Sequence, residues 1–344
     1  MSDLKINNIT NKDGNSVPTI AGVSTVSSSA FMVMPSGNTE IRGAGSGRAV
    51  FLRGYTPSTY TTMDYVNIAT TGNAQDFGDS VRVTVQMANA GSSTRGIIAG
   101  GSVPASEADY YIFSSNGGTN DFGTLSVNRR GTGACNDSTR ALFAGGKQNP
   151  SPASIWYNVI DYFTFTTQGD ANDFGDLTYK SRQLAGCSSP TRGVFCGGYD
   201  PAVTNIINFV TIQSTGDAQD FGDLTVARSS FGGGSNATRG LFASGFKGSP
   251  NNYNIIDYVT IATQGNAQDF GDTLQTGVHN TGTACSQTRA LFAGGYVNPS
   301  PETNIISFVT ISTTGDAADF GDLTVAASVG NDGAASDVNG GIQQ

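Results

Sequence analysis

Two residues that could do chemistry recur along this chain: an arginine that opens a short apolar run, and an aspartate within Asp-Phe-Gly. The arginines are Arg48, Arg95, Arg140, Arg192, Arg239 and Arg289. The aspartates are Asp76, Asp121, Asp173, Asp220, Asp269 and Asp319. A guanidinium binds a carboxylate through two parallel hydrogen bonds. We therefore expect each arginine to pair with a carboxylate of its own or the next repeat, such as the Asp-Phe-Gly aspartate, rather than with a ligand.

Asp-Phe-Gly is often followed by a second aspartate, as in Asp220 and Asp223, and such a pair could ligate calcium. Calcium needs about six to eight oxygen ligands, and the flanking residues supply no obvious set. The companion motifs of protein kinases, which share Asp-Phe-Gly, are missing from the sequence. We expect the carboxylates to bond at turns and strand edges, and the phenylalanine to lie in the core.

Histidine and cysteine chemistry has little support in the sequence. His279 is the one histidine and stands close to where other repeats have Arg182 or Arg228. A metal site would need several such ligands, so no metal, cofactor or catalytic residue is predicted. We predict that the cysteines are small buried residues of strands. They are Cys135, Cys187, Cys196 and Cys285.

The spacing of the motifs shows which elements position them. Successive Asp-Phe-Gly aspartates lie 45, 52, 47, 49 and 50 residues apart. A repeat of this length, built from short strands and glycine turns, is typical of a β-propeller with one blade per repeat. Length varies between the repeated arginine and the following β-branched strand, which identifies one variable loop per blade.

Each repeat offers strand candidates such as Arg289–Gly295, Asn304–Ile311 and Ala317–Leu323, followed by a strand of small residues. Small residues suit the innermost strand, where blades converge. The sixth small-residue strand lies near Ser328–Ser336, and we expect it to complete the blade that starts at Arg48. Residues Glu40–Ser46 compete for that place.

Aromatic residues lie in or beside the variable loops, which should all emerge on one face. They are Tyr55, Tyr60, Trp156, Tyr157, Tyr199, Tyr253 and Tyr296. Exposed rings beside Asn and Ser suit stacking on sugars or contact with a protein, so these residues are predicted to bind a ligand. In the alternative interpretation the rings pack onto the blade ends.

Composition limits the function classes. Charged residues are 13% of the chain and the net charge is −9, which argues against nucleic-acid binding. The sequence has no apolar run long enough to span a membrane and no signal-peptide pattern at its start, so we expect synthesis in the cytoplasm and no membrane insertion. Residues 1–46 are predicted to be an extended attachment segment, and residues 47–344 a six-bladed propeller.

The repeat resembles two known groups. Gly-Gly after the arginine strand and Thr225-Val-Ala-Arg228 resemble kelch-type propeller repeats, although phenylalanine replaces the usual tryptophan. Gly265–Asp272 together with Thr191–Phe195 resembles repeat proteins of marine bacteriophage virions, and the leader, from Leu4 to Val23, is similar to attachment segments of phage fibres. The resemblance covers nearly the whole chain.

What the resemblance implies is a non-enzymatic virion protein of tail-fibre type, assembled in the host cytoplasm. Residues 1–46 would bind other virion proteins, the loop-bearing face would bind host glycan or surface protein, and the protein would be a homo-oligomer in the particle. One alternative is a capsid decoration or tail structural protein without a receptor role. Another is a glycan-degrading enzyme, which would need clustered carboxylates.

Overall fold

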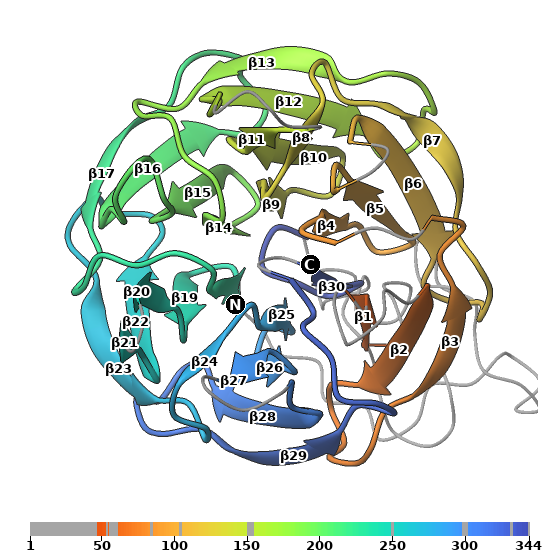
Figure 1. Ribbon diagram of the computed structural model, residues 1–344, viewed down its shortest axis with the longest axis vertical. Coiled ribbons are helices and arrows are strands. Elements are labelled where there is room, and N and C mark those ends of the chain that lie inside the picture. The colour runs from red at the N-terminus through yellow and green to blue at the C-terminus, as the bar shows by residue number, and fades with distance from the viewer. Residues whose placement is uncertain are drawn as a thin grey trace, which may run out of the picture. The chain divides into compact units, whose positions relative to one another are not determined.

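The computed structural model describes residues 47–52, 54, 61–82, 85–102, 105–149, 155–248, 251–297, 302–330 and 333–342. All of them lie in one unit, Gly45–Gln343. The described residues form an all-β propeller in which six four-stranded sheets surround an axis (Figure 1). The predicted fold is confirmed, whereas the predicted attachment segment 1–46 lies outside the described residues.

Each blade is one of these sheets, and its strands follow one another from the axis outward. Blade 1 consists of β30 (Ala334–Ser336), β1 (Arg48–Leu52), β2 (Thr62–Asn67) and β3 (Gln75–Asp79); blade 2 of β4 (Ala88–Gly91), β5 (Arg95–Ala99), β6 (Glu107–Ile112) and β7 (Asn120–Thr124). Blade 3 consists of β9 (Gly133–Asn136), β10 (Arg140–Ala144), β12 (Val159–Thr164) and β13 (Asn172–Asp176); blade 4 of β14 (Ala185–Ser188), β15 (Arg192–Cys196), β16 (Ile206–Thr211) and β17 (Gln219–Asp223). Blade 5 consists of β18 (Gly232–Ser235), β19 (Arg239–Ala243), β22 (Ile255–Thr260) and β23 (Gln268–Asp272); blade 6 of β25 (Gly282–Cys285), β26 (Arg289–Ala293), β28 (Ile305–Thr310) and β29 (Ala318–Asp322).

The ring closes through the end of the chain. β30 pairs antiparallel with β1, with Val50 opposite Ala335. The innermost strand of blade 1 is thus supplied by the C-terminal region, as predicted. β1 is therefore paired on both sides and has no free edge.

The repeated arginines connect neighbouring blades, but not through carboxylates. Arg289 Nη1 in blade 6 donates a hydrogen bond of 3.2 Å to the carbonyl oxygen of Ile68 in blade 1. The equivalent bonds join Arg48 to Phe113, Arg95 to Phe165, Arg140 to Ile212, Arg192 to Ile261 and Arg239 to Ile311. The expected pairing with Asp-Phe-Gly was wrong, because each guanidinium lies at the end of the next blade's third strand, where main-chain carbonyls are the acceptors.

An aromatic ring of the same blade lies beneath each of these guanidinium groups. The Arg48 guanidinium carbon, for example, is 4.6 Å from the centroid of the Tyr65 ring. The other rings belong to Tyr110, Tyr162, Phe209, Tyr258 and Phe308. Such cation–π contacts add to the hydrogen bonds, so the six arginines are structural links around the ring.

Asp-Phe-Gly lies in the outermost strand of each blade and contacts the next blade. Phe77 is buried, as are its equivalents, and its carbonyl accepts a 2.8 Å hydrogen bond from the Gly117 amide of blade 2. Gly78 has φ +139°, and a Cβ there would overlap the Gly117 carbonyl. The motif is therefore explained by close approach of two backbones, and the predicted core position of the phenylalanine is confirmed.

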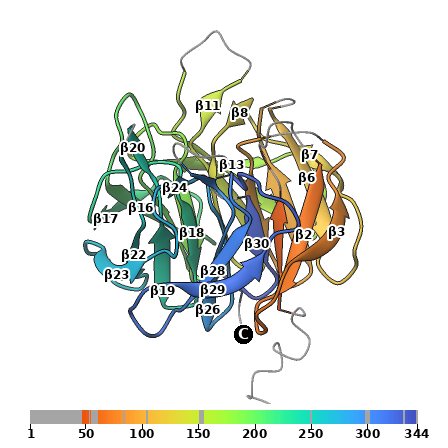
Figure 2. The same cartoon turned by 60° about the horizontal axis from the view of Figure 1, so that its bottom comes forward.

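The two ends of the blades differ (Figure 2). The variable loops and the connections into the innermost strands share one end, which we call the loop face. Short paired strands cap it: β8 (Arg129–Arg130) with β11 (Lys147–Gln148), β20 (Phe246–Gly248) with β21 (Asn251–Asn252), and β24 (Val278–His279) with β27 (Tyr296–Val297). The opposite end, which carries the C-terminal tail and turns such as 68–74, is called the turn face.

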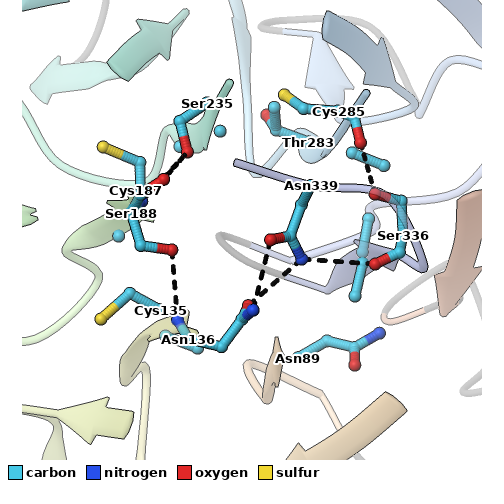
Figure 3. Close-up of a pocket in the computed structure, with 17 residues that line it drawn as sticks. Asn89, Cys135, Asn136, Cys187, Ser188, Ser235, Thr283, Cys285, Ser336 and Asn339 are labelled. Atoms are coloured by element: carbon cyan, nitrogen blue, oxygen red, sulfur yellow. Dashed lines mark hydrogen bonds between the residues drawn. The ribbon is translucent and has the colours of Figure 1, made fainter. Parts of the chain in front are cut away.

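The C-terminal tail closes the central channel at the turn face (Figure 3). Asn339 Nδ2 donates to the Gly91 carbonyl (3.0 Å) and to Asn136 Oδ1 (3.2 Å), while the Gly340 amide donates to the Ser235 carbonyl (2.9 Å). A Cβ at Gly340 would overlap the backbone of Asn236. The tail thereby binds blades 2, 3 and 5, and a cavity of only about 40 Å³ remains in this part of the channel.

The four cysteines are buried in strands, as predicted. Three of them, Cys135, Cys187 and Cys285, lie on innermost strands beside the channel. Burial raises the pKa of the Cys285 thiol to about 12. The Cys285 thiol is therefore a packing group in the protonated form at neutral pH.

Candidate functional site

A ring of residues in the left-handed backbone region surrounds the axis at the loop face. One residue per blade adopts this conformation just before the innermost strand; they are Gln86, Gly131, Gln183, Ser230, Asn280 and Gly330, with φ from +58° to +86°. The amides of Gly131, Gln183, Ser230 and Asn280 each donate to the equivalent carbonyl of the preceding blade, at 2.6 to 2.9 Å. Non-glycine residues pay about 1–3 kcal/mol for such a conformation, and the bonds between blades hold them in it.

A cavity of about 300 Å³ lies at the blade 1 section of this ring. Its described lining residues come from blades 1, 2, 3 and 6, and they are Gly54, Val85, Gln86, Arg130, His279, Asn280, Tyr296, Glu302, Ser328 and Gly330. A volume of this size falls within the range of small-ligand sites. The cavity is thus the axial mouth of the propeller on the loop face.

Four polar side chains of the cavity each have a buried atom without a hydrogen-bond partner in the described part of the chain. These atoms are Gln86 Oε1, Arg130 Nε, His279 Nδ1 and Asn280 Oδ1. A buried polar atom left unpaired costs about 1–3 kcal/mol, and most such atoms in folded proteins are paired. The same four residues line the cavity, so its wall is polar and incompletely hydrogen-bonded within the described part of the chain.

Aromatic rings form one wall of the site. The His279 ring lies between Phe246 and Tyr296, with centroid distances of 5.3 Å and 5.2 Å. Burial lowers the pKa of His279 to about 4, so the imidazole is neutral at pH 7. The wall is therefore an uncharged aromatic surface, which suits the face of a sugar ring.

Positive charge lies on the opposite side of the cavity. Arg130 on β8 is directly across the strand pair from Lys147 on β11. Arg182 of blade 4 is adjacent, because the Gln183 amide donates a 2.6 Å hydrogen bond to the Gly131 carbonyl. Burial and the neighbouring charge of Arg130 lower the pKa of Arg182. The three side chains form a group that we call the cationic cluster.

The predicted ligand-binding aromatics have different surroundings. Tyr296 lines the cavity. The Trp156 ring lies 5.6 Å from Lys147 Nζ, and the Tyr199 ring 5.2 Å from the Arg182 guanidinium carbon, so both rings flank the cationic cluster. Tyr157 and Tyr253 are half-buried in their loops. Tyr55 and Tyr60 lie outside the described residues, and ligand binding by the whole set stays a prediction.

The repeated motifs lie away from this cavity. The six arginines link blades near the turn face, and the Asp-Phe-Gly aspartates lie exposed on the outermost strands. Sequence reasoning missed Gln86, Arg130, Asn280 and Glu302 as site residues, and it read His279 as a simple repeat substitution. One signal in the sequence could have indicated the site. Arg130, Arg182 and His279 occupy equivalent positions in the ring, yet the residue type at this position differs from blade to blade.

No helix in the described part of the chain is long and apolar enough to cross a membrane. Within the described ranges, no group of three or more His, Cys, Asp or Glu side chains is arranged to hold a metal ion. No protein-family model matches the chain, and no curated protein matches it. The site itself is therefore the main guide to function.

Proposed function

We propose that this protein is a non-enzymatic appendage of a phage virion that binds a glycan of the host surface through its loop face. The observation that carries the binding role is the axial cavity, which is lined by the polar side chains of Gln86, Arg130 and Asn280 together with the rings of His279 and Tyr296. Sugar sites combine these features, since hydroxyls need polar partners and the ring face needs an apolar surface. The virion assignment is supported by the resemblance of the repeats.

Binding fits the cavity better than hydrolysis does. Glycosidases place two carboxylates on either side of the bond that they cleave. The cavity's described lining residues include one carboxylate, that of Glu302. This supports a binding site over a glycan-degrading one, and incubation with bound polysaccharide should release no new reducing ends.

The binding role is tested with the full-length protein on an array of neutral and acidic bacterial surface polysaccharides. We expect binding that is lost in Tyr296→Ala. Tyr258→Ala is the matched control, because that ring is half-buried at the turn face under Arg239. Absence of binding to every glycan, or equal loss in both variants at equal thermal stability, contradicts the proposal.

The virion role needs a separate test. Purified particles should contain the protein by mass spectrometry, and electron cryo-microscopy should show the loop face pointing outward. Particles that lack the protein would overturn the assignment. Loops that contact other virion proteins would instead favour the capsid decoration or tail structural role.

A further inference from the structure

The loop face carries a group of cations of its own. Leaving aside the six repeated arginines and the buried ion pairs, the described cations all lie in segments of the loop face; they are Arg130, Lys147, Lys180, Arg182 and Lys247. The outermost strands carry aspartates instead, as in β17, where Asp220 and Asp223 flank Phe221 and Gly222. A protein of net charge −9 therefore presents positive charge at its axial cavity.

The cationic cluster has no acidic partner in the described part of the chain. The ion pairs found there belong to other arginines: Arg82 with Asp109, Arg129 with Asp161 and Arg228 with Asp257. Arg130 Nε and Arg182 Nε are both buried and without a hydrogen-bond partner. A group of close, partly desolvated guanidinium ions is unfavourable on its own, and an anion supplies the missing charge and acceptors.

We propose that the axial cavity binds an acidic sugar residue whose carboxylate is held by Arg130. This inference deepens the proposed function and rests on it. The carboxylate would accept hydrogen bonds from Arg130, with Arg182 and Lys147 adding charge from the same side. Repulsion from Glu302, which lines the same cavity, would turn the acidic group away from blade 6.

The remaining groups of the cavity suit the rest of the sugar. The ring face lies against His279 and Tyr296, and its hydroxyls bond to the amide groups of Gln86 and Asn280 and donate to the Glu302 carboxylate. A hydroxyl bonded to a carboxylate is a charge-assisted donor, so Glu302 selects for hydroxyls. Nucleic acid fits less well, because its binding needs cations along a whole strand rather than around one cavity.

The test measures affinity of the full-length protein by calorimetry for polygalacturonate, alginate and hyaluronate, and for the carboxyl-reduced, neutral form of each. We expect at least one acidic polymer to bind about tenfold or more tighter than its reduced form, the usual contribution of a hydrogen bond to a charged group. Arg130→Gln should remove that difference. Lys180→Gln is the control, since Lys180 is an exposed cation of the same face, and it should change affinity less than twofold.

The outcomes separate this inference from the proposed function. Equal binding of acidic and reduced polymers, or unchanged preference in folded Arg130→Gln, overturns the acidic-sugar inference and leaves glycan binding intact. Tighter binding of a single-stranded oligonucleotide or of dextran sulfate than of any carboxylated polymer also overturns it. If the wild-type protein binds no glycan on the array, the proposed function itself is contradicted.

Discussion

Arg129 and Arg130 are adjacent on β8, yet only Arg129 forms an ion pair within the described residues. Arg129 is fully buried, and its Nη2 lies 3.0 Å from Asp161 Oδ2 and 3.0 Å from the Phe143 carbonyl oxygen. Arg130 is half-buried and lines the axial cavity. Successive side chains of a strand point to opposite faces, so one of two identical neighbours lies in the core and the other lines the cavity.

This division predicts effects of very different size for the same substitution at the two positions. Arg129→Met should lower the free energy of unfolding by about 3–5 kcal/mol, because Asp161 would remain buried without its cation. Arg130→Met should change it by less than about 1 kcal/mol. Urea unfolding followed by far-UV circular dichroism measures both. Adding Asp161→Asn to Arg129→Met removes the unpaired charge but keeps an acceptor for Ser126 N and Oγ, so it should recover part of the stability; failure of that double variant to improve on the single one would contradict the assignment.

The Asp-Phe-Gly glycine is predicted to be required for contact between blades. Gly78→Ala places a Cβ against the Gly117 carbonyl at φ +139°, and we expect a loss of about 2 kcal/mol or more. Gly117→Ala is the matched control in the same contact. Its Cβ would meet nothing within 4 Å and its φ is not positive. Thermal unfolding should place Gly117→Ala near the wild type, and equal melting temperatures for both variants would count against the close-approach explanation.

The architecture could be predicted because the repeat is encoded locally. The constant distance between the β-branched strand and Asp-Phe-Gly fixes two strands and a turn, and the count of small-residue strands predicts the C-terminal closure. The acceptor of Arg289 could not be predicted in this way. It is a carbonyl of Ile68, more than two hundred positions away, and depends on how neighbouring blades are offset.

The cavity was hidden from the sequence for a related reason. Gln86 and Asn280 adopt the left-handed conformation because bonds between blades hold them there, and neither residue type demands it. The aromatic residues in the loops were a better guide. Tyr296 lines the cavity, while Trp156 and Tyr199 contact cations beside it.

Stability should depend on pH through His279. Its pKa is about 4 in the folded protein, against 6.5 in the unfolded chain. Between these values the unfolded chain binds a proton that the folded protein excludes, so the free energy of unfolding falls as pH drops from 6.5 to 4 and then levels off. The full difference is at most about 3 kcal/mol and is reduced by solvent around the half-buried ring. Urea unfolding of wild type and His279→Gln across this range measures it, and parallel pH profiles would contradict the assignment.

Removal of the C-terminal strand should open the ring. A chain that ends at Gly333 lacks β30, which leaves the inner edge of β1 unpaired and exposes Ala49 and Phe51, both fully buried in the closed ring. We expect loss of cooperative unfolding and self-association through the free edge, measured by calorimetry and light scattering. A chain that ends at Ile342 keeps β30 and the Asn339 contacts and should behave as the wild type.

The substitution Asn339→Ala tests the contribution of the C-terminal tail independently of that of β30. It keeps β30 but removes the hydrogen bonds to Gly91 and Asn136, at an expected cost of about 1–3 kcal/mol. If the truncation at Gly333 proves no more harmful than Asn339→Ala, the tail rather than β30 closes the propeller. A truncated chain that unfolds as cooperatively as the full one would show that the five blades with complete inner strands are stable without closure.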